Sequence, residues 1–209
     1  MATTRPCEQF RREMLAPYDV MRPPWVTYAG VPVWKWPTDL WVYQEIIAEC
    51  RPDLIIETGT AFGGSALYFS QLLDTFSPGG QVITIDVADY VGGARSPKVH
   101  YVTASSLHPS AVAVATSAAR DHKRVMVTLD GDHSAKTVRT ELDLYGPLVT
   151  PGQYLVVEDT YIDRYLDVPD GPWTALSGWL PEHPEFVNDV LRDGHPTSTN
   201  PGGWLRRQP

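Results

Sequence analysis

Residues 52–65, PDLIIETGTAFGGS, decide the fold class of this chain. Leu54, Ile55 and Ile56 form an apolar run between a proline and Glu57, which is typical of a buried strand. The glycine-rich loop that follows leads into residues 65–76, whose apolar side chains recur at helical spacing. A buried strand, a glycine loop and a helix in this order predict the start of an α/β fold.

The centre of the chain continues this alternation of strand and helix patterns. Short apolar runs predict four more strands, at residues 82–85, 99–102, 125–129 and 154–157. Helical patterns cover residues 110–119 and 134–145, and Ser134 is placed to cap the second helix. Five apolar strands separated by helices or loops predict a mainly parallel sheet covered by helices on both faces.

Acidic residues end four of the five predicted strands: Glu57, Asp86, Asp130 and Glu158. A single acid at a strand end is usually a solvated loop residue, but four at equivalent positions are hard to explain as ordinary surface. In such sheets ligands bind beyond the carboxyl ends of the strands. We therefore expect a binding site at this edge, where Asp86 is placed to accept hydrogen bonds from a ribose diol or, alternatively, to cap a helix or turn.

The loop after the first strand has two features that suit a ligand. Gly59, Gly63 and Gly64 allow the backbone to approach a ligand closely, and the next helix offers free N–H groups to a carboxylate or phosphate. The glycine spacing differs from the dinucleotide fingerprint, and Glu57 would repel a pyrophosphate but attract an ammonium group. The loop therefore favours S-adenosylmethionine over NAD, with a plain tight turn as the alternative.

A second group of acids follows the fourth and fifth strands. If these strands are neighbours, Asp132, Glu158 and Asp159 can converge, and crowded carboxylates repel unless a cation lies between them. Oxygen ligands favour Mg²⁺, with Mn²⁺ or Ca²⁺ as alternatives, and the competing interpretation is a set of independent helix and turn caps. Mg²⁺ bound to a hydroxyl lowers the pKa of that hydroxyl, and His133 suits either a base or a cofactor contact.

Length and composition indicate one acidic domain over residues 1–209, with a helical and aromatic flank (1–50), a cofactor core (51–160) and an acceptor-side flank (161–209). The net charge of −8 argues against nucleic acid and anionic membranes as partners. No apolar run approaches the roughly 20 residues of a membrane span. Cys7 and Cys50 give no disulfide framework, and the start of the chain lacks a signal-peptide core, so we expect a soluble, cytoplasmic protein.

Five segments of the sequence, in order, resemble the cephalosporin hydroxylase family: residues 30–47, 52–67, 141–149, 152–160 and 199–205. Despite its name, that family is similar to class I methyltransferases and includes antibiotic and rhamnosyl O-methyltransferases. The resemblance covers about residues 25–207. It implies a Rossmann-like class I methyltransferase fold, bound S-adenosylmethionine and a magnesium site at Asp132, Glu158 and Asp159.

The resemblance also implies roles for individual residues. Ser65 would meet the methionine carboxylate, Ser105 and Ser106 the adenine rim, and His133 the region of the transferred methyl group. The full set of expected cofactor contacts is Glu57, Gly59, Thr60, Gly63, Ser65, Asp86, Ser105, Ser106, Asp130 and His133. His133 and Asp132 are the expected catalytic residues.

Together these features predict an O-methyltransferase that acts on a hydroxyl of a small natural product of sugar, polyketide or β-lactam type in secondary metabolism. Two alternatives are a hydroxylase-type enzyme on the same fold and a non-catalytic binding subunit. Aromatic side chains of the flanks would wall the acceptor pocket, and they are Trp25, Trp34, Trp36, Trp173 and Trp179. Lys35 would pair with an acidic group there, and the proline-rich flanks also suit a lid or the contact of a homo-oligomer.

Overall fold

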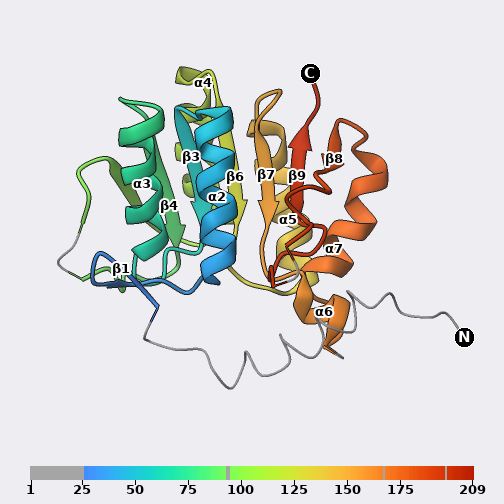
Figure 1. Cartoon of the computed structure of the whole chain (residues 1–209). Coiled ribbons are helices and arrows are strands. Elements are labelled where there is room, and N and C mark those ends of the chain that lie inside the picture. The colour runs from blue at the N-terminus through green and yellow to red at the C-terminus, as the bar shows by residue number, and fades with distance from the viewer. Residues whose placement is uncertain (1–25, 93–94, 167, 196) are drawn as a thin grey trace, which may run out of the picture.

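The computed structural model describes residues 26–92, 95–166, 168–195 and 197–209. Within these ranges, a seven-stranded sheet has the order β5-β4-β3-β6-β7-β9-β8 (Figure 1). Its strands are β3 (Leu54–Thr58), β4 (Gln81–Asp86), β5 (Val99–Thr103), β6 (Val125–Leu129), β7 (Tyr154–Val157), β8 (Phe186–Asn188) and β9 (Trp204–Arg207). Neighbouring strands from β3 to β7 are parallel, whereas β9 is antiparallel to both β7 and β8. The mainly parallel sheet and the five predicted strands are confirmed.

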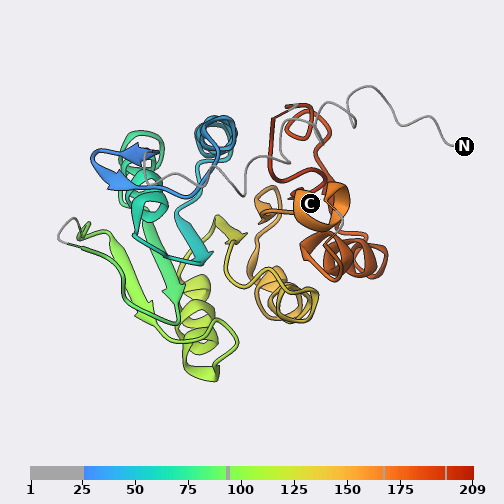
Figure 2. The ribbon, with the colours of Figure 1, turned by 90° about the horizontal axis from the view of Figure 1, so that it is seen from below.

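Helices cover both faces of this sheet, as the view along the strands shows (Figure 2). One face carries α2 (Pro37–Cys50) and α3 (Gly64–Phe76), and the other carries α4 (Pro109–Asp121), α5 (Ala135–Tyr145) and α7 (Pro172–Trp179). A short helix, α6 (Tyr161–Tyr165), follows β7, and a small hairpin of β1 (Thr27–Tyr28) and β2 (Val31–Pro32) precedes α2. Two 3₁₀ turns, Gly146–Leu148 and Leu180–Glu182, follow α5 and α7.

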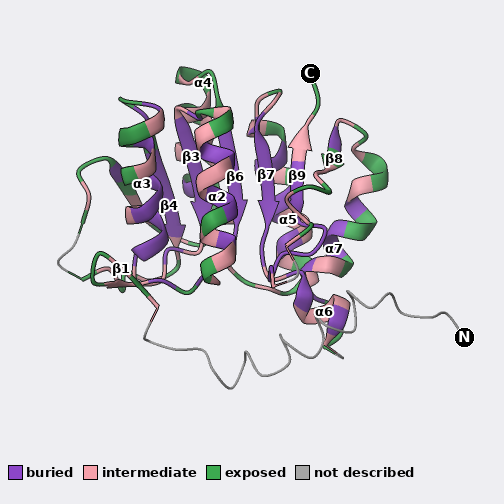
Figure 3. Cartoon of the chain, in the orientation of Figure 1, coloured by how far each residue is buried: buried purple, intermediate pink, exposed green. Residues whose placement is uncertain are grey.

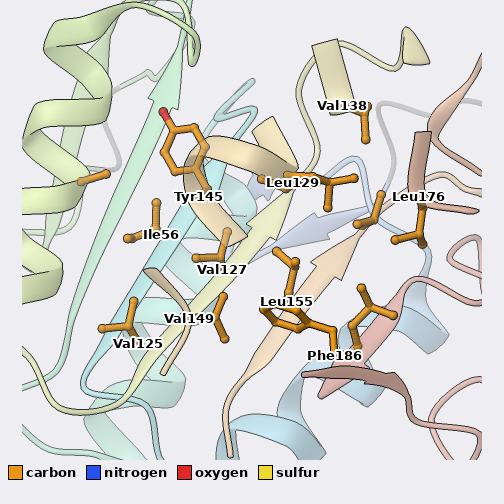
Figure 4. Close-up of a cluster of buried hydrophobic side chains, with 14 of the residues drawn as sticks. Ile56, Val125, Val127, Leu129, Val138, Tyr145, Val149, Leu155, Leu176 and Phe186 are labelled. Carbon is orange, nitrogen blue, oxygen red and sulfur yellow. The ribbon is translucent and has the colours of Figure 1, made fainter. Parts of the chain in front are cut away.

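The core lies on both sides of the sheet because successive strand residues point to opposite faces. In β3, Leu54 and Ile56 join the cluster under α4, α5 and α7, while Ile55 joins the cluster under α2 and α3. Figure 3 shows the resulting pattern, with buried strands between helices that are exposed on their outer sides. Figure 4 shows Ile56, Val127 and Leu155 from three adjacent strands in the first cluster.

The register of the parallel strands brings their carboxyl ends to one edge. Thr58 pairs with Leu129, and Leu129 pairs with Val157, so the residues that follow β3, β6 and β7 emerge side by side. This confirms the predicted neighbourhood of the fourth and fifth strands. Ser134 caps α5 as predicted, with its hydroxyl accepting from the backbone N–H of Thr137. Among the described residues, no helix has both the length and the apolar character needed to cross a bilayer.

Candidate active site

A pocket of about 1050 Å³ opens at the carboxyl edge of the sheet. The arrowheads of β4, β6 and β7 point to this edge, which lies at the bottom of Figure 1. The pocket is lined by the segment before α2, the glycine loop after β3, and the turns after β4, β5, β6 and β7. The predicted site residues that line this pocket are Gly59, Asp86, Ser105, Ser106, Asp130, Asp132, His133 and Asp159.

Gly59 shows why the first turn requires glycine. Its φ is +89°, and a Cβ atom at this position would lie 1.9 Å from the carbonyl oxygen of Asp130. Only the absence of a side chain lets the turns after β3 and β6 pack this closely. Gly63 also has a positive φ, +82°, and is the N-cap residue of α3.

Glu57 and Thr60 lie beneath this loop rather than in the lining of the pocket. Glu57 is fully buried, its Oε2 accepts from the Thr84 hydroxyl at 2.7 Å, and the Thr60 hydroxyl lies 2.7 Å from that of Thr84. Burial raises the pKa of Glu57 to about 7, while Lys35 and the hydroxyls of Ser65 and Thr84 oppose the shift. These side chains therefore support the loop from below in the structure.

Asp86 lines the pocket and also holds the glycine loop. Its Oδ2 accepts from the backbone N–H of Ala61 at 2.9 Å, and its Oδ1 accepts from that of Ala88 at 3.3 Å. The turn-capping alternative is thus observed. These two hydrogen bonds leave a lone pair on each carboxylate oxygen of Asp86 for a ligand hydroxyl.

A three-residue group with the spacing of metal ligands lies between the turns after β6 and β7. Nε2 of His133 is 3.4 Å from Oδ1 of Asp130 and 3.5 Å from Oδ2 of Asp159. One ligand atom from each of these three residues lies within 4.8 Å of the other two. Of the three acids that the sequence assigned to the metal, Asp159 belongs to this group.

Asp132 lines the same pocket but makes the contacts of a helix cap. Its Oδ1 accepts from the backbone N–H of Ser134 at 2.9 Å, and its Oδ2 accepts from the Thr137 hydroxyl at 2.9 Å. The backbone hydrogen bond from Ser134 is the main cause that lowers the pKa of Asp132. Asp132 therefore makes the contacts of the helix-cap alternative, and a role as a metal ligand would be additional to them.

Glu158 is buried behind the pocket and is held through one oxygen. Its Oε1 lies 2.5 Å from Nζ of Lys35, 2.6 Å from the Tyr43 hydroxyl and 2.8 Å from the Thr128 hydroxyl. Burial, followed by the neighbouring Asp130, raises the pKa of Glu158 to about 8, although Lys35 opposes this. Glu158 therefore lies outside the Asp130–His133–Asp159 group but is linked to Asp130 through the shared ammonium of Lys35.

Lys35 pairs with acidic groups, as the sequence suggested. Its Nζ lies 2.6 Å from Oδ2 of Asp130, which lines the same pocket, and 2.5 Å from Oε1 of Glu158. Burial opposes its charge, yet Asp130, Glu158 and Glu57 together raise the pKa of Lys35 above its ordinary value. Four acids at one predicted sheet edge were the signal that an internal cation was needed.

The loop after residue 197 contributes residues that the sequence analysis did not single out as functional. Oδ1 of Asn200 accepts from the backbone N–H of Asp159 at 2.9 Å, and the Thr199 hydroxyl donates to Oδ2 of Asp39 in α2 at 2.8 Å. Asp159 has a positive φ of 56°, which is uncommon for a residue with a side chain. The C-terminal loop thus fixes the turn that presents Asp159.

Aromatic side chains form one wall of the pocket. The ring of Trp34, which is 50% exposed, lies 5.2 Å from that of Phe62, and Phe62 lies 6.5 Å from Tyr90. Trp36 also lines the pocket. The expectation for Trp173 and Trp179 was wrong: neither lines the pocket, because Trp173 packs on Arg164 and Trp179 is fully buried in the core. Trp25 lies outside the described residues.

Comparison with known proteins places this geometry in a family. The family model described as Rhamnosyl O-methyltransferase/CmcI matches residues 24–208. A rhamnosyl O-methyltransferase of Mycobacterium tuberculosis is 35% identical over 185 residues, which cover 85% of this chain and 74% of the relative. One from Mycobacterium leprae is 33% identical over 192 residues, covering 87% of this chain and 83% of the relative.

Solved structures agree on the fold. A CmcI structure with Mg and S-adenosylmethionine matches with a TM-score of 0.69 at 20% identity, covering 100% of this chain and 89% of that chain. An O-methyltransferase from Bacillus cereus in complex with S-adenosylhomocysteine matches with a TM-score of 0.56 at 16% identity, covering 90% and 84%. The class I methyltransferase fold and the resemblance inferred from the five sequence segments are both confirmed. This chain belongs to the rhamnosyl O-methyltransferase/CmcI family of S-adenosylmethionine-dependent O-methyltransferases.

Proposed function

We propose that this chain transfers the methyl group of S-adenosylmethionine to a hydroxyl group of a sugar-containing small molecule, with Mg²⁺ in the site. The observation that carries the proposal is one pocket in which the glycine loop, Asp86 and the Asp130–His133–Asp159 group meet. Family membership and the names of the curated relatives, rhamnosyl O-methyltransferases, support methyl transfer to a sugar.

The cofactor half of the pocket fits a nucleoside that carries an amino acid. Asp86 retains lone pairs for a ribose diol, and Ser105 and Ser106 line the neighbouring wall for the adenine. Oε1 of Glu57 accepts no hydrogen bond among the described residues, and Nζ of Lys35 lies 4.0 Å from it, so this oxygen retains acceptor capacity for the ammonium group predicted beside it. Gly63 and Ser65 at the start of α3 remain the predicted contacts of the carboxylate.

The acids of the adjacent turns fit a divalent cation because hard oxygen ligands are concentrated there. We propose Asp159 as a ligand together with Asp132 and Glu158, the set that the sequence predicts. Asp130 is the other candidate ligand beside Asp159, since one ligand atom of each lies within 4.8 Å of the other. When bound, the cation lowers the pKa of an acceptor hydroxyl that contacts it.

The transfer forms a bond between the acceptor oxygen and the methyl carbon while the bond from that carbon to sulfur breaks. S-adenosylhomocysteine leaves, and the proton of the acceptor hydroxyl needs a base. Nε2 of His133 lies in the pocket near the carboxylates of Asp130 and Asp159, which stabilise the positive charge of a protonated imidazole. We therefore assign proton uptake to His133 and alignment of the reactants to the pocket walls.

The acceptor half of the pocket fits a sugar ring. Trp34 and Phe62 offer flat apolar faces at the pocket wall, and aromatic faces pack well against the C–H faces of sugars. A polyketide or β-lactam acceptor, which the sequence also allowed, is disfavoured relative to a sugar by the names of the curated relatives.

A two-part experiment tests this function. Isothermal titration with S-adenosylhomocysteine, with Mg²⁺ and with EDTA, measures cofactor binding, and mass spectrometry detects methylation of methyl α-L-rhamnopyranoside. We expect cofactor binding in both buffers and methylation only with Mg²⁺, with Asp159→Asn abolishing methylation and preserving the far-UV spectrum. Binding of NAD in place of S-adenosylhomocysteine would reject the cofactor, and full activity in EDTA would reject the metal.

A further inference from the structure

A single ammonium group joins the ends of three strands in this protein. Lys35 is 3% exposed and lies just before α2, at the boundary between the N-terminal hairpin and the sheet edge. Its Nζ is within 2.6 Å of Asp130 after β6 and within 2.5 Å of Glu158 after β7. It is also 4.0 Å from Glu57 in β3. No other lysine or arginine of the described residues forms an ion pair with these three acids.

The ammonium lies against one oxygen of each partner. In Asp130 it takes Oδ2, while Oδ1 faces the imidazole of His133. In Glu158 it shares Oε1 with the hydroxyls of Tyr43 and Thr128. Lys35 therefore fixes how both carboxylates are turned.

Carboxylates at this spacing repel one another, and the repulsion is large where the groups are removed from water. A buried charge without a partner is strongly destabilising. Because Glu57, Glu158 and Lys35 are all essentially buried, the ammonium supplies the balancing charge that a divalent cation would otherwise have to supply. The sheet edge can then form before any metal binds.

We infer that Lys35 is a positioning residue, an internal counter-cation that assembles the acidic edge of β3, β6 and β7 in the absence of metal. The inference rests on the proposed function only in taking this edge as the magnesium site. In the parent protein, metal then contributes little to folding and is needed chiefly for turnover. Without the ammonium, metal becomes a folding ligand as well, since it is the remaining source of positive charge between the acids.

Thermal unfolding of Lys35→Met, in EDTA and in saturating Mg²⁺, tests this. Methionine keeps the length of the side chain and removes its charge. We expect the melting temperature in EDTA to fall by roughly 10 °C, the size expected when one partner of a buried ion pair is lost from a protein of this length. We expect Mg²⁺ to recover most of that loss, while the parent and the matched surface variant Lys98→Met shift little with Mg²⁺. If isothermal titration shows that the parent protein binds Mg²⁺, an equal loss in both buffers would show that Lys35 is only a packing residue and would overturn the inference.

A charge-balanced variant keeps the test decisive if Lys35→Met does not fold. Lys35→Met combined with Glu158→Gln removes the ammonium together with one of its two nearest carboxyl partners. Where Lys35→Met folds, the two single variants complete a double-mutant cycle in EDTA. Where it does not fold, the double variant is expected to fold in EDTA, and failure of the double variant to fold would overturn the inference. We expect the pair to be more stable than the sum of the single losses predicts. Simple additivity would overturn the inference. If the parent protein binds no Mg²⁺ in that titration, the proposed magnesium site fails, and the variants in EDTA still decide the role of Lys35.

Discussion

The side-chain oxygen of Asn200 accepts a hydrogen bond from the backbone N–H of Asp159, with 2.9 Å between the two atoms. This bond connects the C-terminal loop to the turn after β7, where Asp159 has a φ of +56°. The same loop is tied to α2 because Thr199 donates to Asp39. The position of Asp159, a candidate metal ligand, thus depends on Asn200 and, through Thr199, on Asp39. Asn200 and Asp39 lie about 40 and about 120 positions from Asp159 in the sequence, and only the tertiary structure brings them together.

Asn200→Ala is expected to weaken Mg²⁺ binding about tenfold, the lower end of the effect seen when the partner of a metal ligand is removed. The backbone N–H of Asp159 would lose its acceptor and the turn would lose its support. Titration with Mg²⁺ measures the change, and Asn188→Ala in β8, away from the pocket lining, is the control. Equal Mg²⁺ affinity in Asn200→Ala and the parent would contradict the proposed role.

Asp132→Ala is expected to abolish methyl transfer and to lower stability by about 1 kcal/mol, because it removes both a proposed ligand and a helix cap. Ser134→Ala separates the two effects, since Ser134 caps the same helix without being a proposed ligand. We expect Ser134→Ala to lose similar stability and keep turnover. If Asp132→Ala retains parental turnover, Asp132 is a cap alone.

Gly59→Ala is expected to destabilise the protein by several kcal/mol, because the added Cβ would meet the carbonyl oxygen of Asp130 at 1.9 Å. Gly79→Ala is a close control: its φ is +91°, but nothing lies within 4 Å of the added atom. It therefore carries only the backbone cost of about 1 kcal/mol. Urea unfolding of both variants isolates the contact with Asp130, and similar losses would argue against the close packing of these two turns.

Trp34→Ala is expected to raise the KM for a rhamnoside acceptor about five- to tenfold, equivalent to roughly 1 kcal/mol of lost aromatic contact. The affinity for S-adenosylhomocysteine should stay within about twofold of the parent value, because Trp34 lies in the acceptor half of the pocket. Trp41→Ala is the matched control, since Trp41 is 60% exposed in α2 and does not line the pocket. Equal changes of the KM in both variants would show that the aromatic wall does not bind the acceptor.

Glu141 makes stability depend on pH. It is fully buried in α5, and burial raises its pKa from 4.5 to about 7, while the hydroxyls of Ser106 and Thr58 oppose the shift. The folded state therefore holds this proton where the unfolded state has released it, so stability falls as pH rises from about 4.5 to about 7. The loss from this group is at most on the order of 3 kcal/mol.

Glu141→Gln carries no titrating proton at this position and should flatten that part of the pH profile. Chemical unfolding of the parent and the variant at several pH values between about 4.5 and 8 measures the two slopes. Parallel profiles would show that Glu141 does not keep its proton in the folded protein.

The sequence by itself determined the parallel part of the sheet. Most of its strands are largely apolar runs such as Leu54–Ile56 or Val125–Leu129, bounded by a turn or an acid, and this pattern is local. The sequence also determined the glycine loop and the acids at the strand ends, since both follow directly from the strand assignments. β8 and β9 were not predicted, because Trp204–Arg207 becomes a strand through pairing with β7 and carries no strong pattern of its own.

Tertiary structure decided which acids meet and what neutralises them. Asp132 and Asp159 both follow strands, but different contacts hold them. The Asp132 carboxylate accepts from Ser134 and Thr137 at the start of α5, whereas the backbone N–H of Asp159 donates to Asn200 in the C-terminal loop. The sequence suggested that Lys35 pairs with an acidic group, but it did not reveal which buried carboxylates surround this lysine. Electrostatic partners are set by distances across the fold, which local patterns do not encode, and so the balance of charge at this site became apparent only from the structure.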